Sequence, residues 1–403
     1  MKQFVAILGR QPELSVAELC AVAHRHCVTI EPLNDFAAFV QGDETWVDRF
    51  ALFGGLVKVG EVLAHVPNID GLFADDTVRQ LHAALPVKGK VVFGISAYGS
   101  PSFIRSTQAF SKRIKVFLAE NGRPARFLLG ERGTLSSVVV DKERLVERGM
   151  ELLLFERPRE IVIAKTVAVQ HYEEFSTRDY GRPQRNATSG MLPPKLARIL
   201  LHLADVDEST TLMDPFCGSG TILQEALLLG FQSLIGSDQS DKAIRETKAN
   251  LAWLAKHEQR ELPAVRSFQS DVNNLGRVLL PATIGCVVTE PYLGPPQKGG
   301  EDVLAIRAEL EVLYQKAFRV FAQLLEDGGK VVFLLPVFFR NAKPHFIMNL
   351  DAWLTEGFRL IDPLPPEWLT AFEKRLTFRK TLLYIRPGQR VGREILLLQR
   401  RRA

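Results

Sequence analysis

The sequence predicts an α+β region followed by an α/β region, in which a mostly parallel sheet ends in an antiparallel hairpin. The chain has 403 residues, enough for two or three domains at roughly 150 residues each. Beyond residue 190, strand-like and helix-like segments alternate, which is typical of a parallel sheet covered by helices on both faces. Before residue 180 they are mixed without strict alternation, which favours an α+β arrangement.

In the α+β region, apolar runs predict short strands and amphipathic stretches predict helices. The first helix opens near Pro12, with Ser15 as N-cap and Glu18 three residues later, a capping box. The other predicted helices cover residues 46–53, 78–84, 104–120 and 142–147, and the predicted strands cover residues 4–8, 37–40, 91–97, 126–129 and 136–140.

A connector rich in Gly, Pro, Arg, Asn and Ser spans residues 180–194, and we place the main domain boundary there. Beyond it, the predicted strands cover residues 210–213, 233–237, 265–269, 284–289 and 330–335, and the predicted helices cover residues 221–229, 240–257 and 304–325. Two final β-rich runs, residues 381–386 and 394–399, flank a Pro-Gly turn and predict an antiparallel hairpin at a sheet edge.

The composition is that of an ordinary globular protein, with 46% hydrophobic and 24% charged residues. The longest apolar runs are far shorter than the ~20 residues of a membrane helix, and the apolar stretch after Met1 is too short for a signal peptide. The four cysteines make no disulfide framework in a chain of this length, so we expect a cytoplasmic protein without a membrane partner. The net charge of +5 does not decide for or against nucleic acid.

The segment Asp214-Pro-Phe216-Cys-Gly218-Ser-Gly220-Thr221 joins a predicted strand to a predicted helix. Two glycines allow a tight turn next to a ligand, and the N-terminus of the helix presents free N–H groups. A dinucleotide fingerprint would need a third glycine where Leu223 stands. Asp214 would repel a diphosphate, so it suits a cationic group, such as the α-amino group of a methionine moiety.

Two more carboxylates follow the next predicted strands. Asp238 lies about 20 residues beyond the glycine loop, where an acid can accept hydrogen bonds from a ribose. Asp271, followed by Val272, ends the third strand, where an acid can accept from an adenine amino group. Each aspartate alone could be an N-cap or a turn residue. The ordered set predicts a site for S-adenosylmethionine, which is cationic and carries no phosphate.

The loop Thr289-Glu290-Pro291-Tyr292 leaves the fourth strand and resembles the (Asp/Asn)-Pro-Pro-(aromatic) loop of amino-methyltransferases. In this interpretation Glu290 and the carbonyl of Pro291 accept the N–H bonds of an exocyclic base amine, and Tyr292 stacks on the base. Glutamate replaces Asp/Asn here, one proline of the pair is missing, and either Thr289 or Glu290 could occupy the acidic position. A Pro-containing turn with an incidental acid is the alternative.

The connector carries Gly-Met191-Leu-Pro193-Pro-Lys-Leu-Ala, and with this segment the chain resembles the archaeal and eukaryotic tRNA guanosine-10 N2-methyltransferases. Further matching stretches are residues 8–15, 169–180 and 386–389, so the likeness covers nearly the whole chain. This resemblance implies that Met191 and Pro193 complete the cofactor pocket and that tRNA is the partner. At one position the chain departs from the family, since family members often carry Asp where this chain has Asn186. The implied domains are a ferredoxin-like α+β subdomain (1–58), a THUMP RNA-binding domain (59–165), a linker (166–190) and a Rossmann-like S-adenosylmethionine-dependent methyltransferase domain (191–403).

Basic residues gather where RNA is expected to bind. On the helix predicted over residues 104–120, the aromatic and aliphatic side chains can face the core while basic side chains face solvent, where they can follow phosphates. From charge alone a solvated helix surface is equally good, and the THUMP resemblance favours RNA. The predicted RNA-binding residues are Arg105, Lys112, Arg113 and Lys115 on the helix, and Arg182 and Arg185 in the connector.

Two other motifs carry no predicted function. Cys20, His24 and Cys27 share one helix, but a single helix supplies no return ligands, so no metal site is predicted. The pair Phe338-Phe339, after the strand predicted over residues 330–335, is interpreted as closing the end of the sheet.

We expect an S-adenosylmethionine-dependent RNA methyltransferase that modifies the exocyclic N2 amine of a guanosine in tRNA, at position 10 by resemblance. The alternatives are an rRNA or DNA amino-methyltransferase, or an RNA-binding protein that binds the cofactor without turnover. We expect a monomer. The modified position, mono- or dimethylation and the need for a small activating protein partner stay open.

Overall fold

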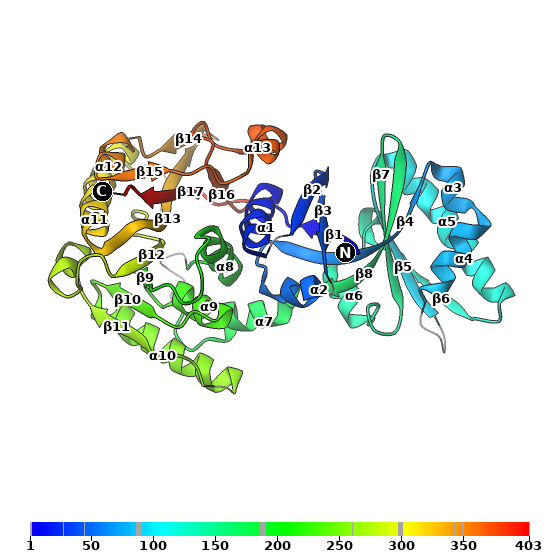
Figure 1. Ribbon diagram of the computed structural model, residues 1–403, viewed down its shortest axis with the longest axis horizontal. Coiled ribbons are helices and arrows are strands. Elements are labelled where there is room, and N and C mark those ends of the chain that lie inside the picture. Colours follow the sequence, from blue (N-terminus) through cyan, green and yellow to red (C-terminus); the bar gives the residue numbers. More distant parts are fainter. Residues whose placement is uncertain are drawn as a thin grey trace. The chain divides into compact units, whose positions relative to one another are not determined.

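The computed structural model describes residues 2–26, 28–43, 45–85, 91–185, 191–259, 261–296, 301–341, 343–348 and 350–402. The chain forms two compact units (Figure 1): Met1–Pro12 with Cys27–Tyr172, and Glu13–His26 with Glu173–Ala403. The first helix therefore belongs with the C-terminal part of the chain.

The first unit is α+β, as predicted. Its strands are β1 (Lys2–Leu8), β2 (Thr29–Asn34), β3 (Ala37–Gly42), β4 (Leu56–Val66), β5 (Val91–Tyr98), β6 (Ala125–Leu128), β7 (Met150–Arg157) and β8 (Glu160–Val169). Its helices are α2 (Thr45–Arg49), α3 (Ile69–Phe73), α4 (Asp75–Ala83), α5 (Pro101–Glu120) and α6 (Ser137–Lys142), with 3-10 turns at Phe50–Leu52 and Glu131–Gly133. Within the described residues the strands form one sheet in the order β2-β3-β1-β4-β8-β7-β5-β6.

The strand β4 runs across the boundary predicted at residue 58. It pairs with β1 on one side and with β8 on the other, so the segments 1–58 and 59–165 contribute to one sheet. Their division into two subdomains stays a prediction.

Helix α5 packs with the face that the sequence predicts. Phe103, Phe110 and Ile114 are buried in the core of the first unit, and Phe117 is half-buried. Ser100 caps the helix by accepting a hydrogen bond from the amide of Phe103 at 3.3 Å.

Three predictions for local structure are wrong. Residues 136–140 are predicted as a strand but begin α6, because the side chain of Ser136 caps the helix at the amide of Val139. The helix predicted over residues 142–147 does not form, because Lys142 ends α6 and residues 143–148 form turns. The helix α1 (Pro12–His26) begins before Ser15, so this residue lies inside the helix and no capping box forms. Instead, the buried Glu18 accepts from Nδ1 of His202 at 2.7 Å.

The second unit is α/β. Its strands are β9 (Leu212–Asp214), β10 (Leu234–Asp238), β11 (Val265–Gln269), β12 (Ile284–Thr289), β13 (Leu325–Arg340), β14 (Lys343–Phe346), β15 (Phe358–Leu360), β16 (Leu382–Tyr384) and β17 (Val391–Arg400). Its helices are α1, α7 (Tyr172–Ser176), α8 (Pro194–Leu203), α9 (Thr221–Leu229), α10 (Asp241–Glu258), α11 (Val303–Leu324), α12 (Asp351–Leu354) and α13 (Pro366–Phe372). A π-helical turn covers Thr177–Gly181, and 3-10 turns cover Val272–Arg277 and Glu373–Arg375.

The sheet of the second unit has the order β11-β10-β9-β12-β13-β17-β15, with β14 paired to β13 and β16 to β17. The strands from β11 to β13 are parallel, and β17 and β15 are antiparallel to their neighbours. This confirms the predicted mostly parallel sheet with an antiparallel C-terminal hairpin, β16–β17. Within the hairpin, β17 is nearly continuously buried between β13 on one side and β15 and β16 on the other. Among the described strands β16 pairs with β17 alone, so the hairpin reaches the sheet edge through β16.

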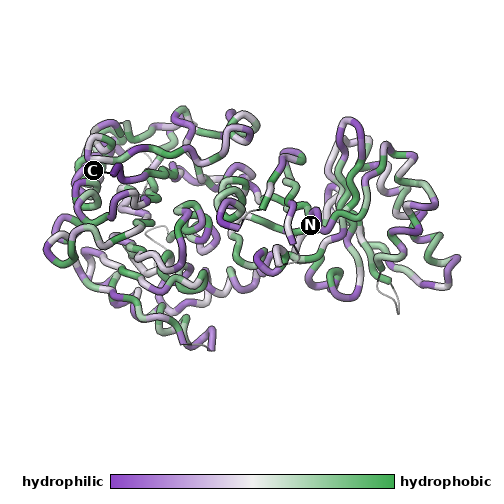
Figure 2. The backbone as a smooth tube through the Cα atoms, in the orientation of Figure 1, coloured by the Kyte–Doolittle hydropathy of each residue, from purple (hydrophilic) through white to green (hydrophobic). Residues whose placement is uncertain are grey.

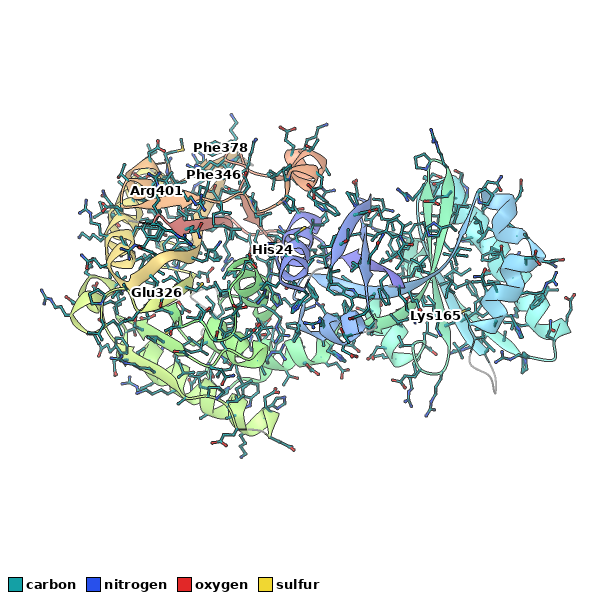
Figure 3. The ribbon with its side chains drawn as sticks, viewed as in Figure 1. His24, Lys165, Glu326, Phe346, Phe378 and Arg401 are labelled. Atoms are coloured by element: carbon teal, nitrogen blue, oxygen red, sulfur yellow. The ribbon has the colours of Figure 1, made fainter. Side chains whose placement is uncertain are left out.

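The cores follow the strands. Hydrophobic residues run along the strands of both sheets in Figure 2, in agreement with their burial. Phe338 is buried in the core, but it lies inside β13, which continues to Arg340, so the predicted position after the end of the strand is wrong. At the surface, Phe346 and the exposed Phe378 meet edge to face with ring centres 5.1 Å apart (Figure 3). Among the helices that the structure describes, none has the length and hydrophobicity of a membrane span.

Candidate functional site

A cavity of about 820 Å³ opens in the second unit next to the carboxyl ends of β9, β10 and β12. This is where open parallel sheets bind ligands, and the volume is within the usual range for small-molecule sites. The walls come from the glycine loop after β9, the loops after β10 and β12, the connector at Met191 and Leu192, and the segment that leads into β17.

The glycine loop is held in place by α10. Gly218 and Gly220 have positive φ angles of 52° and 83°, which favour glycine. Oγ1 of Thr247 donates to the carbonyl of Gly218 at 2.8 Å, and Nδ2 of Asn250 donates to the carbonyl of Ser219 at 2.9 Å. A Cβ at Gly218 would meet nothing within 4 Å, so this residue leaves room for a ligand.

Asp214 is the most deeply buried carboxylate of the cavity, with 2% of the residue exposed. Its Oδ1 accepts from Oγ1 of Thr289 at 2.6 Å and from the amide of Phe216 at 3.2 Å. Burial, reinforced by the nearby carboxylates of Asp238 and Glu290, raises the pKa of Asp214 to about 7, although both hydrogen bonds oppose the shift. A cationic ligand would favour the ionised form.

Asp238 ends β10 and lines the same cavity. Its Oδ2 accepts from the amide of Gly218 at 3.0 Å, and its Oδ1 accepts from the amide of Ser240 at 2.9 Å. These contacts fix the carboxylate beside the glycine loop and leave lone pairs for a ligand hydroxyl.

At the end of β12, Thr289 and the next residue, Glu290, lie in different environments. Thr289 is fully buried and bonded to Asp214, whereas Glu290 lines the cavity. Of the two registers left open by the sequence, the one with Glu290 in the acidic position therefore fits this geometry. Oε1 of Glu290 accepts from Nε of Arg393 in β17. Burial raises the pKa of Glu290, and the Arg393 guanidinium opposes this.

The rest of the loop is fixed from α11. Tyr292 lines the cavity and is 55% exposed, so its ring is accessible for stacking. Its backbone carbonyl accepts from the hydroxyl of the buried Tyr314 at 2.6 Å. Pro291, between Glu290 and Tyr292 in the sequence, is buried and also lines the cavity.

The cavity unites most, but not all, of the predicted site residues. Asp271 is not among its lining residues; its Oδ1 accepts from the amide of Asn273 at 2.8 Å, and it caps the following 3-10 turn. Gly220, Val272 and Pro193 are also outside the lining. The predicted cofactor and base residues that line the cavity are Met191, Asp214, Phe216, Gly218, Thr221, Asp238, Glu290, Pro291 and Tyr292.

The predicted RNA-binding role of Arg182 does not fit its position. Only 3% of Arg182 is exposed, and its Nη1 donates to Oγ1 of Thr221 at 2.6 Å. It therefore ties the connector to the start of α9 rather than facing solvent. The guanidinium of Arg185 lies 4.8 Å from the ring centre of Tyr180. Asn186 and the rest of residues 186–190 are outside the described residues.

On α5, three of the predicted RNA-binding side chains, Arg105, Lys112 and Lys115, are exposed. Arg113 is half-buried and forms an ion pair with Asp75. Their contact with RNA stays a prediction.

Sequence reasoning missed Arg393 and Tyr314. Arg393 is 103 positions from its partner Glu290 in the chain, so no local motif joins them. Tyr314 is one polar hydroxyl on an otherwise apolar helix face, and such a hydroxyl usually finds a partner when it is buried. That signal could have identified Tyr314 but not its target.

Within the described residues, no group of three or more His, Cys, Asp or Glu side chains could hold a metal ion. Of the motif noted above, Cys27 is outside the described residues. Nδ1 of His24 lies 3.5 Å from Oδ2 of Asp205.

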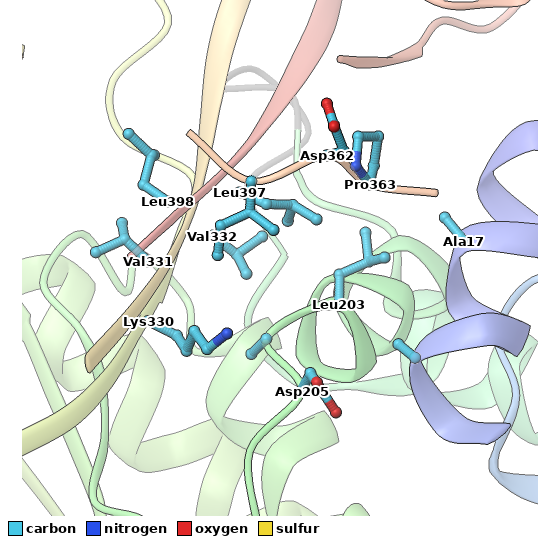
Figure 4. Close-up of a pocket in the computed structure, with 13 residues that line it drawn as sticks. Ala17, Leu203, Asp205, Lys330, Val331, Val332, Asp362, Pro363, Leu397 and Leu398 are labelled. Carbon is cyan, nitrogen blue, oxygen red and sulfur yellow. The ribbon is translucent and has the colours of Figure 1, made fainter. Parts of the chain in front are cut away.

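A second cavity in the same unit, of about 130 Å³, is shown in Figure 4. It lies among α1, α8, β13, β17 and residues 361–363, and aliphatic side chains such as Leu203, Val332 and Leu397 line much of it. Ligand sites usually have 300 Å³ or more, so this cavity is interpreted as a packing gap.

The chain is similar to known methyltransferases. A family model described as RMKL-like, methyltransferase domain, matches residues 182–338. The tRNA (guanine(10)-N2)-dimethyltransferase of Methanothermobacter thermautotrophicus is 27% identical over 201 residues, 49% of this chain and 52% of the relative. The same-named protein of Methanocaldococcus jannaschii is 29% identical over 189 residues, 44% of this chain and 48% of the relative. The chain thus matches about half the length of these two relatives.

A third relative is matched over most of its length. The probable tRNA (guanine(10)-N2)-dimethyltransferase of Methanothermococcus thermolithotrophicus is 30% identical over 132 residues, which are 32% of this chain and 78% of the relative.

Two solved structures share the fold. TrmN from Thermus thermophilus has a TM-score of 0.54 at 19% identity, with 99% of both chains covered. SMU.472, a putative methyltransferase complexed with SAH, has a TM-score of 0.51 at 13% identity, with 100% of this chain and 98% of the other covered. At these identities the likeness concerns the fold alone.

Proposed function

This chain belongs to the tRNA (guanine(10)-N2)-dimethyltransferase family, and on that premise we propose that it transfers methyl from S-adenosylmethionine to the exocyclic N2 amine of a guanosine in tRNA, at position 10 as in its relatives' names. The observation that carries the proposal is one cavity lined by Asp214, Asp238 and Glu290, at the ends of three neighbouring parallel strands.

The donor set of the cavity suits this cofactor. Asp214 is a buried carboxylate and would pair with the cationic α-amino group, while Asp238 would accept from the ribose hydroxyls. Gly218 offers space where a side chain would intrude. Phe216, Ile222 and other apolar lining residues can enclose an adenine ring. When bound, S-adenosylmethionine supplies a methyl group activated by its sulfonium, and the departing sulfur keeps the electron pair of the broken C–S bond.

The protein's contribution to the transfer is positioning. A guanine N2 amine is a poor nucleophile because its lone pair is delocalised into the ring. Glu290 and the carbonyl of Pro291 would each accept one N–H bond, which aims the lone pair at the methyl carbon and favours rehybridisation. Tyr292 would stack on the extruded base. After the N–C bond has formed, the amine gives one proton to water.

We further propose that the first unit holds the RNA, with residues 1–58 as a ferredoxin-like subdomain, 59–165 as a THUMP domain and 166–190 as the linker to the methyltransferase domain, 191–403. Exposed basic side chains on α5 (Arg105, Lys112, Lys115) support this proposal. We expect a monomer in the cytoplasm, where its proposed substrate is found.

The test is to incubate the protein with labelled cofactor and unmodified tRNA, rRNA or duplex DNA, and to identify the product nucleoside by mass spectrometry. N2-methylguanosine in tRNA supports the proposal. Methyladenine in DNA contradicts it, and cofactor binding without turnover on any RNA favours an RNA-binding protein. Glu290→Ala should abolish transfer and leave cofactor affinity nearly unchanged.

A further inference from the structure

Arg393 forms an ion pair with the residue proposed to face the substrate amine. It is 6% exposed, lines the cavity, and donates from Nε to Oε1 of Glu290. Its backbone is fixed on both sides, opposite Pro336 of β13 and Tyr384 of β16. It lies outside residues 182–338, the segment that matches the methyltransferase model.

On the basis of the proposed function, we propose that Arg393 is a positioning residue that keeps Glu290 ionised, so that Glu290 only accepts hydrogen bonds. The pair of Arg393 and Glu290 then selects guanine over adenine. An ionised carboxylate only accepts, and its two oxygens offer about four lone-pair sites. Arg393 uses Oε1, which leaves capacity for the base.

The bases differ in what they present beside the amine. Guanine has a ring N1–H donor next to its N2 amine, so one carboxylate can accept from both. Adenine and cytosine have a ring nitrogen acceptor next to their amines, which would face a carboxylate without a proton between them. A site built to pair a substrate N–H discriminates strongly against an analogue that lacks it.

The charges around Glu290 explain the need for a cation. Glu290 is packed near Asp214 of β9 and Tyr314 of α11, and Arg393 of β17 is the cation in contact with it. Burial raises the pKa of Glu290 and Arg393 opposes this. Without Arg393, Glu290 would more readily take up a proton and become a donor, which matches adenine N1 instead of guanine N1–H.

The experiment uses the full chain and two tRNA transcripts. One carries guanosine at the methylated position found by mass spectrometry. The other carries 2-aminopurine there, which keeps the N2 amine but replaces the N1–H donor by an acceptor. The wild type should prefer guanosine in kcat/KM by about ten- to hundred-fold. Glu290→Gln, whose amide can donate to N1, should reduce that preference at least tenfold.

Arg393→Met should lower kcat and move the acid limb of the pH–rate profile upward by about one to three pH units. Arg393→Lys restores a positive charge and should recover most of the wild-type profile. The matched control is Arg401→Met, an exposed arginine just beyond the same strand, which should leave both preference and profile unchanged.

Equal rates of the wild type on both transcripts, or an unshifted acid limb in Arg393→Met, would overturn the inference. Competition between the two transcripts for binding gives the same comparison without turnover. An enzyme inactive on every RNA therefore refutes the proposed function, whereas equal binding of the two transcripts refutes the role of the pair.

Discussion

Replacing Asp214 by asparagine should stabilise the cofactor-free protein at high pH while it abolishes cofactor binding. Both hydrogen bonds to this side chain, from Thr289 and from the amide of Phe216, end at Oδ1. Asparagine has a carbonyl oxygen that can accept both. The substitution therefore removes the ionisable group and keeps the local contacts.

The magnitude follows from the pKa of Asp214, which burial raises from 3.8 to about 7. The folded state thus binds the proton more tightly than the unfolded state, so the stability of the wild type falls as the pH rises from about 4 to about 7 and stays low above 7. Between pH 5 and pH 7 the loss covers two pH units, or about 3 kcal/mol. Asparagine has no such loss. One kcal/mol corresponds to roughly 2–4 °C in melting temperature. The melting temperature of the variant minus that of the wild type should therefore be about 6–12 °C larger at pH 8 than at pH 5.

The assay is thermal unfolding of the cofactor-free protein at pH 5, 6.5 and 8, with Asp351→Asn as a control because Asp351 is exposed. Equilibrium dialysis with labelled cofactor at pH 8 then measures affinity. Because a neutral amide no longer attracts a cationic amino group, we expect binding to be lost in Asp214→Asn. If the difference in melting temperature between variant and wild type does not change with pH, the argument is refuted. Ionisation of Asp214 would then not destabilise the folded state, so its pKa would not be raised by burial.

Three further changes separate the machinery of the site from the framework. Tyr314→Phe removes the hydroxyl that donates to the carbonyl of Tyr292. Methyl transfer should slow about five- to tenfold, which corresponds to the loss of one hydrogen bond of about 1 kcal/mol. Equilibrium dialysis should show an unchanged cofactor affinity. Glu225→Gln deprives the buried Arg178 and Arg198 of their shared carboxylate and should cost about 3–5 kcal/mol in urea unfolding; a loss below 1 kcal/mol would contradict a buried network. Phe110→Ala in the first unit should cost about 3–5 kcal/mol without changing the cofactor affinity of the second unit, and a parallel loss of binding would argue against this separation.

The second unit was predictable because its signals are local. A buried strand, a glycine turn and a helix follow one another within about 20 residues around Asp214, and the structure has α9 at Thr221–Leu229, as predicted. The strands β11 and β12 also have their predicted bounds. Because parallel strands end at the same edge, Asp214, Asp238 and Glu290, which end or follow β9, β10 and β12, reach one cavity, whereas Asp271 after β11 does not line it.

The errors arise where a distant contact or a cap outweighs local preference. The valines of residues 137–139 favour a strand by propensity, yet the cap at Ser136 starts a helix there. Glu18 looked like a capping residue from its spacing, but it is satisfied by His202, which is 184 positions away. Asp271 shows the reverse: its single-residue interpretation as an N-cap is the contact that the structure has.

Arginine is the residue whose role the sequence conveys least. Charge, together with the family resemblance, assigned Arg182 to an RNA surface along with Arg105. A guanidinium also offers five donors in a rigid fork, however, which suits buried polar contacts. Arg182 uses one of them to hold Thr221 at the start of the glycine-loop helix, and Arg393 uses another to hold Glu290. These two buried arginines therefore help to build the proposed methyl-transfer site. The net charge of +5 includes such buried cations, so it does not measure the positive charge that is exposed for RNA. Only those that stay exposed, such as Arg105 on α5, can contribute to the salt dependence of the proposed tRNA binding.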